Sequence, residues 1–383
     1  MCKNEFRMCD ALLILVIDND LTFSYKNKVP ALLMGNIVIL KIPTVGGLAH
    51  FLTMEAFAKA LPAGTIHFIS GSGRETMPPL MKTGLIDGLA FIGGASAADS
   101  LIKDHPHPHR LKVFLQLEGK NMAIFLSDIF QDQNAAALDH ALNEVVVGSL
   151  SFNGQRCTAL KIIFVPREYS QLFLTKLRDK VEALKVGLPW ERSGKSYSQI
   201  TPLPNSQRIA YMKHLIQDAI SKGASIVNAN GGAIVGGPKS TLMIPAVVFP
   251  VDDTMDLYSQ EQFGPVVPVV PYDTIETAIQ YGRDGSYGQQ CSIFTSEKDS
   301  NDTADILDRF SSIFGKININ SQCGRSPDIL PFSGRRSSAM GVMSVTDALK
   351  EFSVPTVVSF KKDGLTELVM SKVEKRSQFL AKL

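Results

Sequence analysis

Short apolar runs alternate with helically spaced apolar positions in the first third of the chain. Runs of strand length occupy residues 37–41, 65–70 and 85–92, and apolar side chains recur every three to four residues over 47–60. Strands that alternate with helices predict βαβ units and a mostly parallel sheet. Ligands of such a sheet bind beyond the carboxyl ends of its strands. This part of the chain is therefore predicted to be a nucleotide-binding α/β domain.

The rest of the chain repeats the alternation with longer helices. Helical spacing extends over residues 135–150, 169–184 and 206–222, whereas 162–166 and 354–360 are β-rich apolar runs. The fold class that this pattern predicts is α/β throughout. A length of 383 residues fits two domains, and an apolar content of 45% fits packed cores without wide disorder.

Charge and cysteine content argue against several functions. The formal net charge is only +2, so the composition does not favour nucleic acid or acidic lipid as a partner. No apolar stretch approaches the roughly 18 residues of a membrane span, and residues 11–17 are predicted to form a buried strand. Five cysteines are few, and odd in number, for a disulfide framework, which favours a reducing compartment, the cytoplasm.

A run of histidines and prolines lies between His105 and Arg110. The prolines break a helix there, and no cluster of Cys or Asp joins the histidines. Metal sites need several such ligands at suitable spacing, so this segment is predicted to be a loop and no metal site is expected.

A single cysteine, Cys157, lies in a polar turn between the helical pattern of 135–150 and the strand-like run 162–166. The turn contains a glycine and Arg156. The thiolate is the nucleophilic form of cysteine, and a cationic neighbour such as Arg156 lowers the thiol pKa from its ordinary value of about 8.5. These residues favour a catalytic cysteine. The alternative is a structural cysteine, because free cysteines are among the most buried residues.

The segment Asn-Gly-Gln-Arg-Cys-Thr-Ala over residues 153–159 resembles the nucleophile segment of the aldehyde dehydrogenase superfamily. Arginine before the cysteine and Thr-Ala after it make the segment most similar to the non-phosphorylating, NADP-dependent glyceraldehyde-3-phosphate dehydrogenases. Further segments match in the same order, and the resemblance covers residues from about 30 to 360. It implies an aldehyde-dehydrogenase-like fold with an incomplete Rossmann-type cofactor domain at 1–118, an α/β catalytic domain at 119–345, and a terminal helix, oligomerisation strand and tail at 346–383.

The resemblance implies that an aldehyde, glyceraldehyde 3-phosphate or a similar one, is oxidised to the carboxylic acid through a thiohemiacetal and a thioester of Cys157. Most of the family has its general-base glutamate at the position of Gln116, and an amide cannot take a proton. Glu118 resembles the glutamate of the Leu-Glu-x-Lys-Asn arrangement among glyceraldehyde-3-phosphate-type relatives. Residues two apart in a strand share a face, so Glu118 is the predicted base, with a surface ion pair as the alternative.

The implied cofactor is NADP, with NAD as the alternative. Lys41 and Thr44 match the family segment that holds the adenosine ribose, and NAD-preferring relatives commonly have glutamate at the position of Thr44. A hydroxyl does not repel a ribose 2′-phosphate, whereas a carboxylate does. The alternative is that Lys41 and Thr44 form a solvated strand end.

Further cofactor contacts are expected at two glycine turns. Gly71 and the pair Gly93-Gly94 each suit a tight strand-to-helix turn near a dinucleotide, although neither completes a G-x-G-x-x-G fingerprint and ordinary βα turns are the alternative. By resemblance, Glu261 binds the hydroxyls of the nicotinamide ribose and Phe263 packs near the nicotinamide ring.

Substrate and partners are also implied by the resemblance. Arg325, which precedes Pro-Asp, resembles the subfamily's substrate-side arginine, and with Arg156 it could hold a phosphate bidentately. The alternative is two arginines in structural ion pairs. The expected partners are a small aldehyde and further copies of the chain. Self-association is expected because the family's strand that matches residues 354–360 adds to a partner subunit's sheet.

Two departures from the family pattern lie near the N-terminus and at Gln116. Relatives usually carry a longer N-terminal segment, and the asparagine that helps to hold their oxyanion corresponds to Asp18, with Asn19 beside it. A carboxylate opposes an oxyanion, and loss of one donor typically lowers the rate about 100- to 1000-fold. The alternative function is therefore a catalytically impaired or inactive, shortened homologue retained for binding or subunit assembly.

Overall fold

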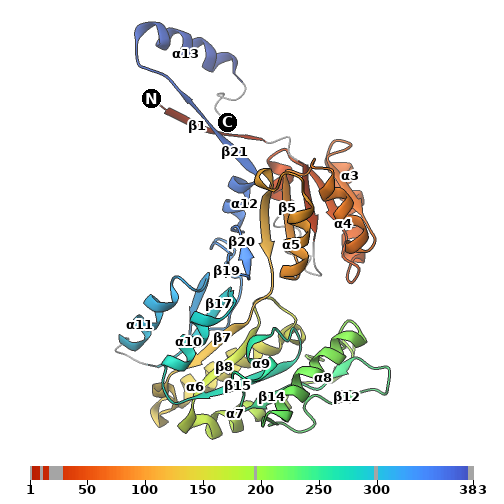
Figure 1. The fold of residues 1–383 in the computed structure, drawn as a ribbon, viewed down its shortest axis with the longest axis vertical. Coiled ribbons are helices and arrows are strands. Elements are labelled where there is room, and N and C mark those ends of the chain that lie inside the picture. The colour runs from red at the N-terminus through yellow and green to blue at the C-terminus, as the bar shows by residue number, and fades with distance from the viewer. Residues whose placement is uncertain (1, 9–11, 17–28, 194–195, 297–300, 378–383) are drawn as a thin grey trace. The chain divides into compact units, whose positions relative to one another are not determined.

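The computed structural model describes residues 2–8, 12–16, 29–193, 196–296 and 301–377 (Figure 1). The chain divides into two units: unit 1 contains residues 1–115, 327–331 and 341–383, and unit 2 contains residues 116–326 and 332–340. Asp18 and Asn19 lie outside the described residues, so the oxyanion-site prediction made for them stays a prediction. The three-part division at 118 and 345 likewise stays a prediction.

Unit 1 is built on a sheet formed by the apolar runs of the first third of the chain. Its strands are β2 (Leu12–Val16), β3 (Ile37–Lys41), β4 (Ile66–Ile69), β5 (Gly88–Ile92) and β6 (Lys112–Gln116). They lie in the order β6-β5-β2-β3-β4, and β2 pairs in parallel with β3 and β5, as β3 does with β4. The predicted strand 37–41 is confirmed with the same bounds, and the other predicted strands are confirmed with ends trimmed by one to three residues.

The helices of unit 1 differ from the predicted pattern at one point. In its first 115 residues they include α2 (Leu48–Phe51), α3 (Met54–Ala60), α4 (Gly73–Lys82), α5 (Ala95–Asp104) and the 3-10 turn η1 (Pro108–Arg110). The single helix predicted over 47–60 is interrupted, because the Thr53 hydroxyl donates a hydrogen bond to His50 O at 2.7 Å and competes with the helical backbone. The segment after α5 is a turn fixed by His105, whose ring is buried and bonds to Ile86 O at 2.9 Å.

The C-terminal part of unit 1 contains the predicted last strand. Its elements are α12 (Val345–Glu351), β21 (Ser353–Ser359) and α13 (Gly364–Arg376), and β21 pairs with β1 (Cys2–Met8). The pairing is antiparallel, with Cys2 opposite Ser359 and Met8 opposite Ser353. Figure 1 shows β1 and β21 side by side. The sequence pattern did not predict β1.

Unit 2 contains a seven-stranded sheet in the order β11-β14-β15-β8-β7-β17-β18. Its strands are β7 (Asn121–Phe125), β8 (Leu160–Pro166), β11 (Ser225–Ile226), β14 (Ala246–Phe249), β15 (Val266–Tyr272), β17 (Gln290–Phe294) and β18 (Lys316–Ile319). All neighbouring pairs are parallel except β11 with β14. Every residue of β7, β8 and β17 is buried, as expected for parallel strands covered on both faces.

Helices pack on both faces of this sheet. They are α6 (Ala135–Leu150), α7 (Ser170–Glu182), α8 (Ser206–Ser221), α9 (Asp256–Ser259), α10 (Glu276–Asp284) and α11 (Asn301–Phe310). One apolar cluster contains side chains of α6 and α7, and a second contains side chains of α8, α10 and α11. The predicted helix 135–150 is confirmed with the same bounds. No described helix is long and apolar enough to cross a membrane.

Short strands and turns complete unit 2. These are η2 (Ser127–Phe130), η3 (Asp132–Asn134), η4 (Ser151–Gly154), η5 (Arg167–Tyr169), β9 (Arg192–Ser193), β10 (Ser196–Tyr197), β12 (Ile234–Val235), β13 (Leu242–Met243), β16 (Tyr287–Gly288), β19 (Arg335–Arg336) and β20 (Ala339–Met340). Of these, η4 positions Cys157, because it is the turn between α6 and β8.

Candidate active site

The turn that leads to Cys157 is strained. Phe152, Asn153 and Gly154 all have positive φ, at 53°, 59° and 70°. A Cβ on Gly154 would lie only 2.5 Å from Gly264 O, so only glycine fits this close approach between two backbones. Non-glycine residues in the left-handed region persist where the surrounding structure fixes them, and such strain clusters at functional sites.

Neighbouring backbone and side-chain groups hold Cys157 itself. Asn121 Nδ2 donates to Cys157 O at 2.7 Å, and Lys161 Nζ donates to the same oxygen at 3.2 Å. The Asn121 side chain also accepts from Gln290 N at 3.0 Å, which ties the cysteine turn to the start of β17. Three strands therefore contribute to the position of one thiol.

The polar cluster around Cys157 lies at the amino ends of the parallel strands of unit 2. Lys120 directly precedes β7, Cys157 shortly precedes β8, and Gln289 directly precedes β17. Because these strands pair in parallel, their first residues meet at one edge of the sheet. The carboxyl-end rule used for the first third of the chain does not extend to this site.

The thiol pKa is shifted in the direction opposite to that expected from Arg156. Burial raises the pKa of the Cys157 thiol, since the thiolate is poorly solvated there. The charges of Lys161 and Arg325 and a hydrogen bond from Gln289 oppose that rise, whereas the charge of Glu261 adds to it. The predicted lowering of this pKa is wrong, because desolvation outweighs the cationic neighbours.

A buried group of charges lies beside the thiol. The Lys161 Nζ contacts Glu261 Oε1 at 2.5 Å, and Gly119 N donates to the same carboxylate oxygen at 3.2 Å. Lys120 Nζ donates to Gln260 O at 2.7 Å and to Gln262 Oε1 at 2.6 Å. Burial holds the pKa of Lys120 well below its ordinary value, and the charge of Lys161 lowers it further.

Glu261 and Phe263, predicted to contact the nicotinamide side of the cofactor, both lie next to Lys161. Lys161 Nζ is 5.5 Å from the centroid of the Phe263 ring, and the Arg208 guanidinium is 5.7 Å from it. Phe263 itself has a φ of 39°, in the left-handed region that disfavours bulky side chains. The structure thus brings both residues to the Cys157 cluster, and their cofactor roles stay predictions.

Glu118 lies in the loop after β6, since the strand ends at Gln116. The argument that the two side chains share a strand face therefore does not apply. Glu118 is half-buried. Burial raises the pKa of Tyr211 and raises that of Tyr287 to about 12, and the charge of Glu118 adds to both shifts. Gln116 is 1% exposed, and neither atom of its amide has a hydrogen-bond partner among the described residues.

The two arginines predicted to bind substrate both act on the thiol. The charge of Arg325 favours the Cys157 thiolate, and its guanidinium lies 4.7 Å from the Phe332 ring centroid. Arg156 Nη2 donates to Gln322 Oε1 at 3.2 Å, while its Nε is buried without a hydrogen-bond partner among the described residues. Burial lowers the pKa of Arg156, and the charge of the cysteine opposes that shift.

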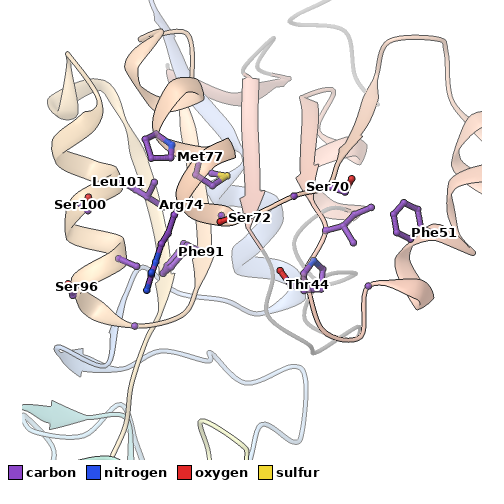
Figure 2. Close-up of a pocket in the computed structure, with 18 of the residues that line it drawn as sticks. Thr44, Phe51, Ser70, Ser72, Arg74, Met77, Phe91, Ser96, Ser100 and Leu101 are labelled. Atoms are coloured by element: carbon purple, nitrogen blue, oxygen red, sulfur yellow. The ribbon is translucent and has the colours of Figure 1, made fainter. Parts of the chain in front are cut away.

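Unit 1 contains a separate cavity of about 1290 Å³ at the carboxyl ends of β3, β4 and β5 (Figure 2). Three of the predicted cofactor residues, Thr44, Gly71 and Gly94, line it, whereas Lys41 and Gly93 are not among its lining residues. Lys41 is 5% exposed, and burial lowers its pKa. The alternative that Lys41 belongs to a solvated strand end is therefore wrong, and its cofactor role stays a prediction.

The cavity also has lining residues that the sequence did not single out. Arg74 and Ser72 lie at the start of α4, and Ser96 and Ser100 lie on α5, as Figure 2 shows. A cation beside a helix N-terminus is a favourable setting for phosphate. The Gly-Ser-Gly-Arg sequence after a strand was the signal that could have identified Arg74.

No group of three or more His, Cys, Asp or Glu side chains that could hold a metal ion occurs among the described residues. The α/β units, the nucleotide-sized cavity and the cysteine with its lysine and arginine neighbours define a class of protein: a two-unit α/β protein with a cysteine-centred polar site. A model of the aldehyde dehydrogenase family matches residues 21–358, and the chain belongs to this family. The family and the fold class predicted from the sequence are confirmed.

Individual relatives agree with this assignment. The chain is 33% identical over 317 residues to the NADP-dependent glyceraldehyde-3-phosphate dehydrogenase of Streptococcus equinus, and 30% identical over 321 residues to that of Pisum sativum. These matches cover 82% and 84% of the chain, and 61% and 60% of the relatives, so the chain spans about six tenths of their length. The solved structure of the Bacillus halodurans C-125 enzyme of the same name, complexed with NADP, has a TM-score of 0.82 at 28% identity, with 93% of this chain and 70% of that chain covered.

Proposed function

We propose that this chain catalyses the NADP-dependent oxidation of a small phosphorylated aldehyde, glyceraldehyde 3-phosphate or a close analogue, to its carboxylic acid. The observation that carries the proposal is the clustering of Cys157 with Arg156, Arg325 and Lys161 at one edge of the unit 2 sheet. Relatives at about 30% identity that are named for this activity support it.

The cavity of unit 1 fits the adenosine part of a dinucleotide. Its lining offers the hydroxyls of Thr44 and Ser72, the cation of Arg74 and the N-terminal turns of α4 and α5. Backbone N–H groups at a helix N-terminus suit a phosphate, and a cation suits a 2′-phosphate. Because no carboxylate lines the cavity among the residues that the structure describes, NADP is the proposed cofactor, with NAD as the weaker alternative. When bound, NADP supplies the hydride acceptor that aldehyde oxidation requires.

The residues of unit 2 carry the covalent steps. The thiol of Cys157 loses its proton to solvent, and the thiolate adds to the aldehyde carbon to give the oxyanion of a thiohemiacetal. Loss of hydride from that carbon leaves a thioester on Cys157. Glu118 takes a proton from a water molecule as the water oxygen adds to the thioester carbon. The carbon–sulfur bond then breaks, which releases the carboxylic acid and regenerates the thiolate.

Arg156 and Arg325 are the proposed holders of the substrate phosphate. A guanidinium presents its N–H groups in a planar fork that matches two phosphate oxygens. A dianion next to Cys157 would in turn disfavour the thiolate, so two cations also compensate the charge that the substrate brings. This gives both arginines a function besides structural ion pairing.

A reducing compartment and self-association complete the proposal. Cys157, Cys291 and Cys323 are free thiols, which supports a cytoplasmic setting. The β21 strand supports a homo-oligomer, because an extended two-stranded ribbon of β1 and β21 offers an edge to a further strand.

The test is an assay of the purified chain with NADP and either glyceraldehyde 3-phosphate or glyceraldehyde. We expect NADPH to form with the phosphorylated aldehyde, and Cys157→Ser to abolish turnover. Arg325→Gln should raise KM for the phosphorylated aldehyde at least tenfold and leave KM for glyceraldehyde within about twofold. Arg178→Gln, an exposed arginine on α7, is the matched control. A folded chain that binds NADP but oxidises neither aldehyde would overturn the proposal.

A further inference from the structure

A second glutamine, Gln289, is directed at the cysteine cluster. It directly precedes β17 and is 1% exposed. Its Oε1 accepts from Asn121 Nδ2 at 3.4 Å, and the same Asn121 nitrogen donates to Cys157 O at 2.7 Å. The amide of Gln289 is therefore fixed from its oxygen end by the residue that also holds the cysteine.

The nitrogen end of that amide is unsatisfied. Gln289 Nε2 is buried and has no partner of ordinary hydrogen-bond geometry among the described residues. A buried N–H without an acceptor is costly, and such groups are rare unless a function retains them. The side chain nevertheless acts on the Cys157 thiol as a hydrogen-bond donor that opposes the rise of its pKa. A thiol accepts hydrogen bonds only weakly, whereas a thiolate is an anionic acceptor and bonds more strongly to the same donor.

The neighbouring Gln290 is a structural glutamine, and the hydrogen bonds of its amide can be compared with those of Gln289. Gln290 is fully buried, its Nε2 donates to Gly324 O at 3.1 Å, and its Oε1 accepts from Gly324 N at 3.0 Å. Asn318 Nδ2 also donates to Gln290 Oε1, at 3.3 Å. Both ends of the Gln290 amide are thus used within the fold, whereas one end of Gln289 is left for the cysteine.

We infer that Gln289 is a catalytic residue whose Nε2–H donates to the Cys157 thiolate and stabilises the nucleophilic form. A hydrogen bond to the charged form of a group favours that form. Burial disfavours the thiolate here, so a fixed neutral donor supplies part of the stabilisation that solvent does not. The inference rests on the proposed assignment of Cys157 as nucleophile.

Other charges also face this thiol, and each comes from a different part of unit 2. Lys161 lies on β8, Arg156 directly precedes Cys157, Arg325 lies in the loop after β18, and Glu261 lies in the loop before β15. All four remain in a variant altered only at Gln289. A difference in the apparent pKa of the thiol between the parent and that variant therefore measures the effect of the Gln289 amide.

The test is the pH dependence of iodoacetamide alkylation at Cys157, measured by peptide mass spectrometry on the full chain without cofactor or substrate. Gln289→Met removes the donor at similar side-chain length. We expect the apparent pKa of alkylation to rise by about one unit, which lowers the rate about tenfold at a pH well below the pKa. Gln290→Met is the matched control, and it should leave this apparent pKa within a few tenths of a unit.

The outcomes separate this inference from the proposed function. An unchanged pKa in Gln289→Met, or an equal shift in Gln290→Met, overturns the role of Gln289 and leaves Cys157 as nucleophile. A parent chain in which Cys157 reacts no faster than Cys291 removes the nucleophile itself. Circular dichroism checks folding, and if Gln289→Met does not fold, Gln289→Glu retains an acceptor for Asn121 and has no amide donor. That variant should raise the apparent pKa by more than one unit, and an unchanged value would again overturn the inference.

Discussion

The Lys161 ammonium contacts the Glu261 carboxylate at 2.5 Å, with the two side chains 1% and 11% exposed. Both charges act on the adjacent cysteine in opposite directions: Lys161 favours the Cys157 thiolate and Glu261 disfavours it. The pair therefore links the carboxylate expected to bind the nicotinamide ribose to the nucleophile. Lys161 and Gly119 N both bind Glu261 Oε1, so a ligand hydroxyl that binds this oxygen must share it with them.

Removal of only one partner of this buried pair should strongly lower the free energy of unfolding. Lys161→Met leaves Glu261 as an uncompensated buried charge, so the free energy of unfolding should fall by about 3–5 kcal/mol. The double variant Lys161→Met with Glu261→Gln should recover part of that loss, because no unpaired charge remains. Urea unfolding followed by circular dichroism measures both.

An exposed ion pair gives the matched control. Arg167 Nε contacts Asp273 Oδ1 at 2.7 Å, with side chains 59% and 68% exposed. Arg167→Gln should lower the free energy of unfolding by no more than about 1 kcal/mol. Equal losses in Lys161→Met and Arg167→Gln would contradict the account of a buried pair.

Thiol labelling should rank the three described free cysteines by burial and charge. Burial raises the pKa of Cys157, but more strongly that of Cys291, and it raises that of Cys323 to about 12. A raised pKa means less thiolate at neutral pH. Labelling of Cys157 should therefore be slower than labelling of the amino acid cysteine in solution, and it should accelerate as the pH rises. Peptide mass spectrometry after iodoacetamide treatment should still find Cys157 labelled first. Faster labelling of Cys323 would be inconsistent with these shifts.

The sequence predicted those elements whose signal is local. The helix Ala135–Leu150 has alanine-rich, helically spaced apolar residues and was predicted with its observed bounds. The strand β1 was missed, because its reason to be extended is its pairing with β21, more than 300 residues away. Similarly, β7 has only five residues after a polar segment, and its burial arises from its neighbours β8 and β17.

The site shows the same division between local and tertiary information. Arg156 and Cys157 are adjacent in sequence, so their motif was readable, whereas the role of Lys161 beside Glu261 was not predicted. Gln289 shares Asn121 with the Cys157 turn only because β7 and β17 pair in a particular register, which no local pattern specifies. The wrong direction for the thiol pKa has the same cause, since desolvation depends on what packs around Cys157 rather than on the residue before it.

Cofactor preference should depend on two residues of the unit 1 cavity. Arg74→Gln should weaken NADP binding about tenfold, since a cation that faces the 2′-phosphate is lost, and should leave NAD binding within about twofold. Thr44→Glu should weaken NADP binding and favour NAD, because a carboxylate repels the 2′-phosphate and accepts from a 2′-hydroxyl. Dissociation constants from fluorescence titration measure both. Equal weakening of NADP and NAD by Arg74→Gln would place Arg74 away from the 2′-phosphate.

The remaining prediction concerns the base that releases the product. If Glu118 takes the proton of the hydrolytic water, Glu118→Gln should permit thiohemiacetal formation and one burst of NADPH per site, and should block steady turnover. The loss of a general base is worth about 100- to 10,000-fold, whereas a lost surface ion pair is worth at most about 1 kcal/mol. Gln116 offers the complementary variant, because its buried amide lies without hydrogen-bond partners among the described residues at the position where most of the family has its base. Gln116→Glu should raise the steady rate of Glu118→Gln if that position still reaches the thioester. Rapid-mixing kinetics separates the burst from the steady state, and undiminished turnover in Glu118→Gln would show that another group removes the proton.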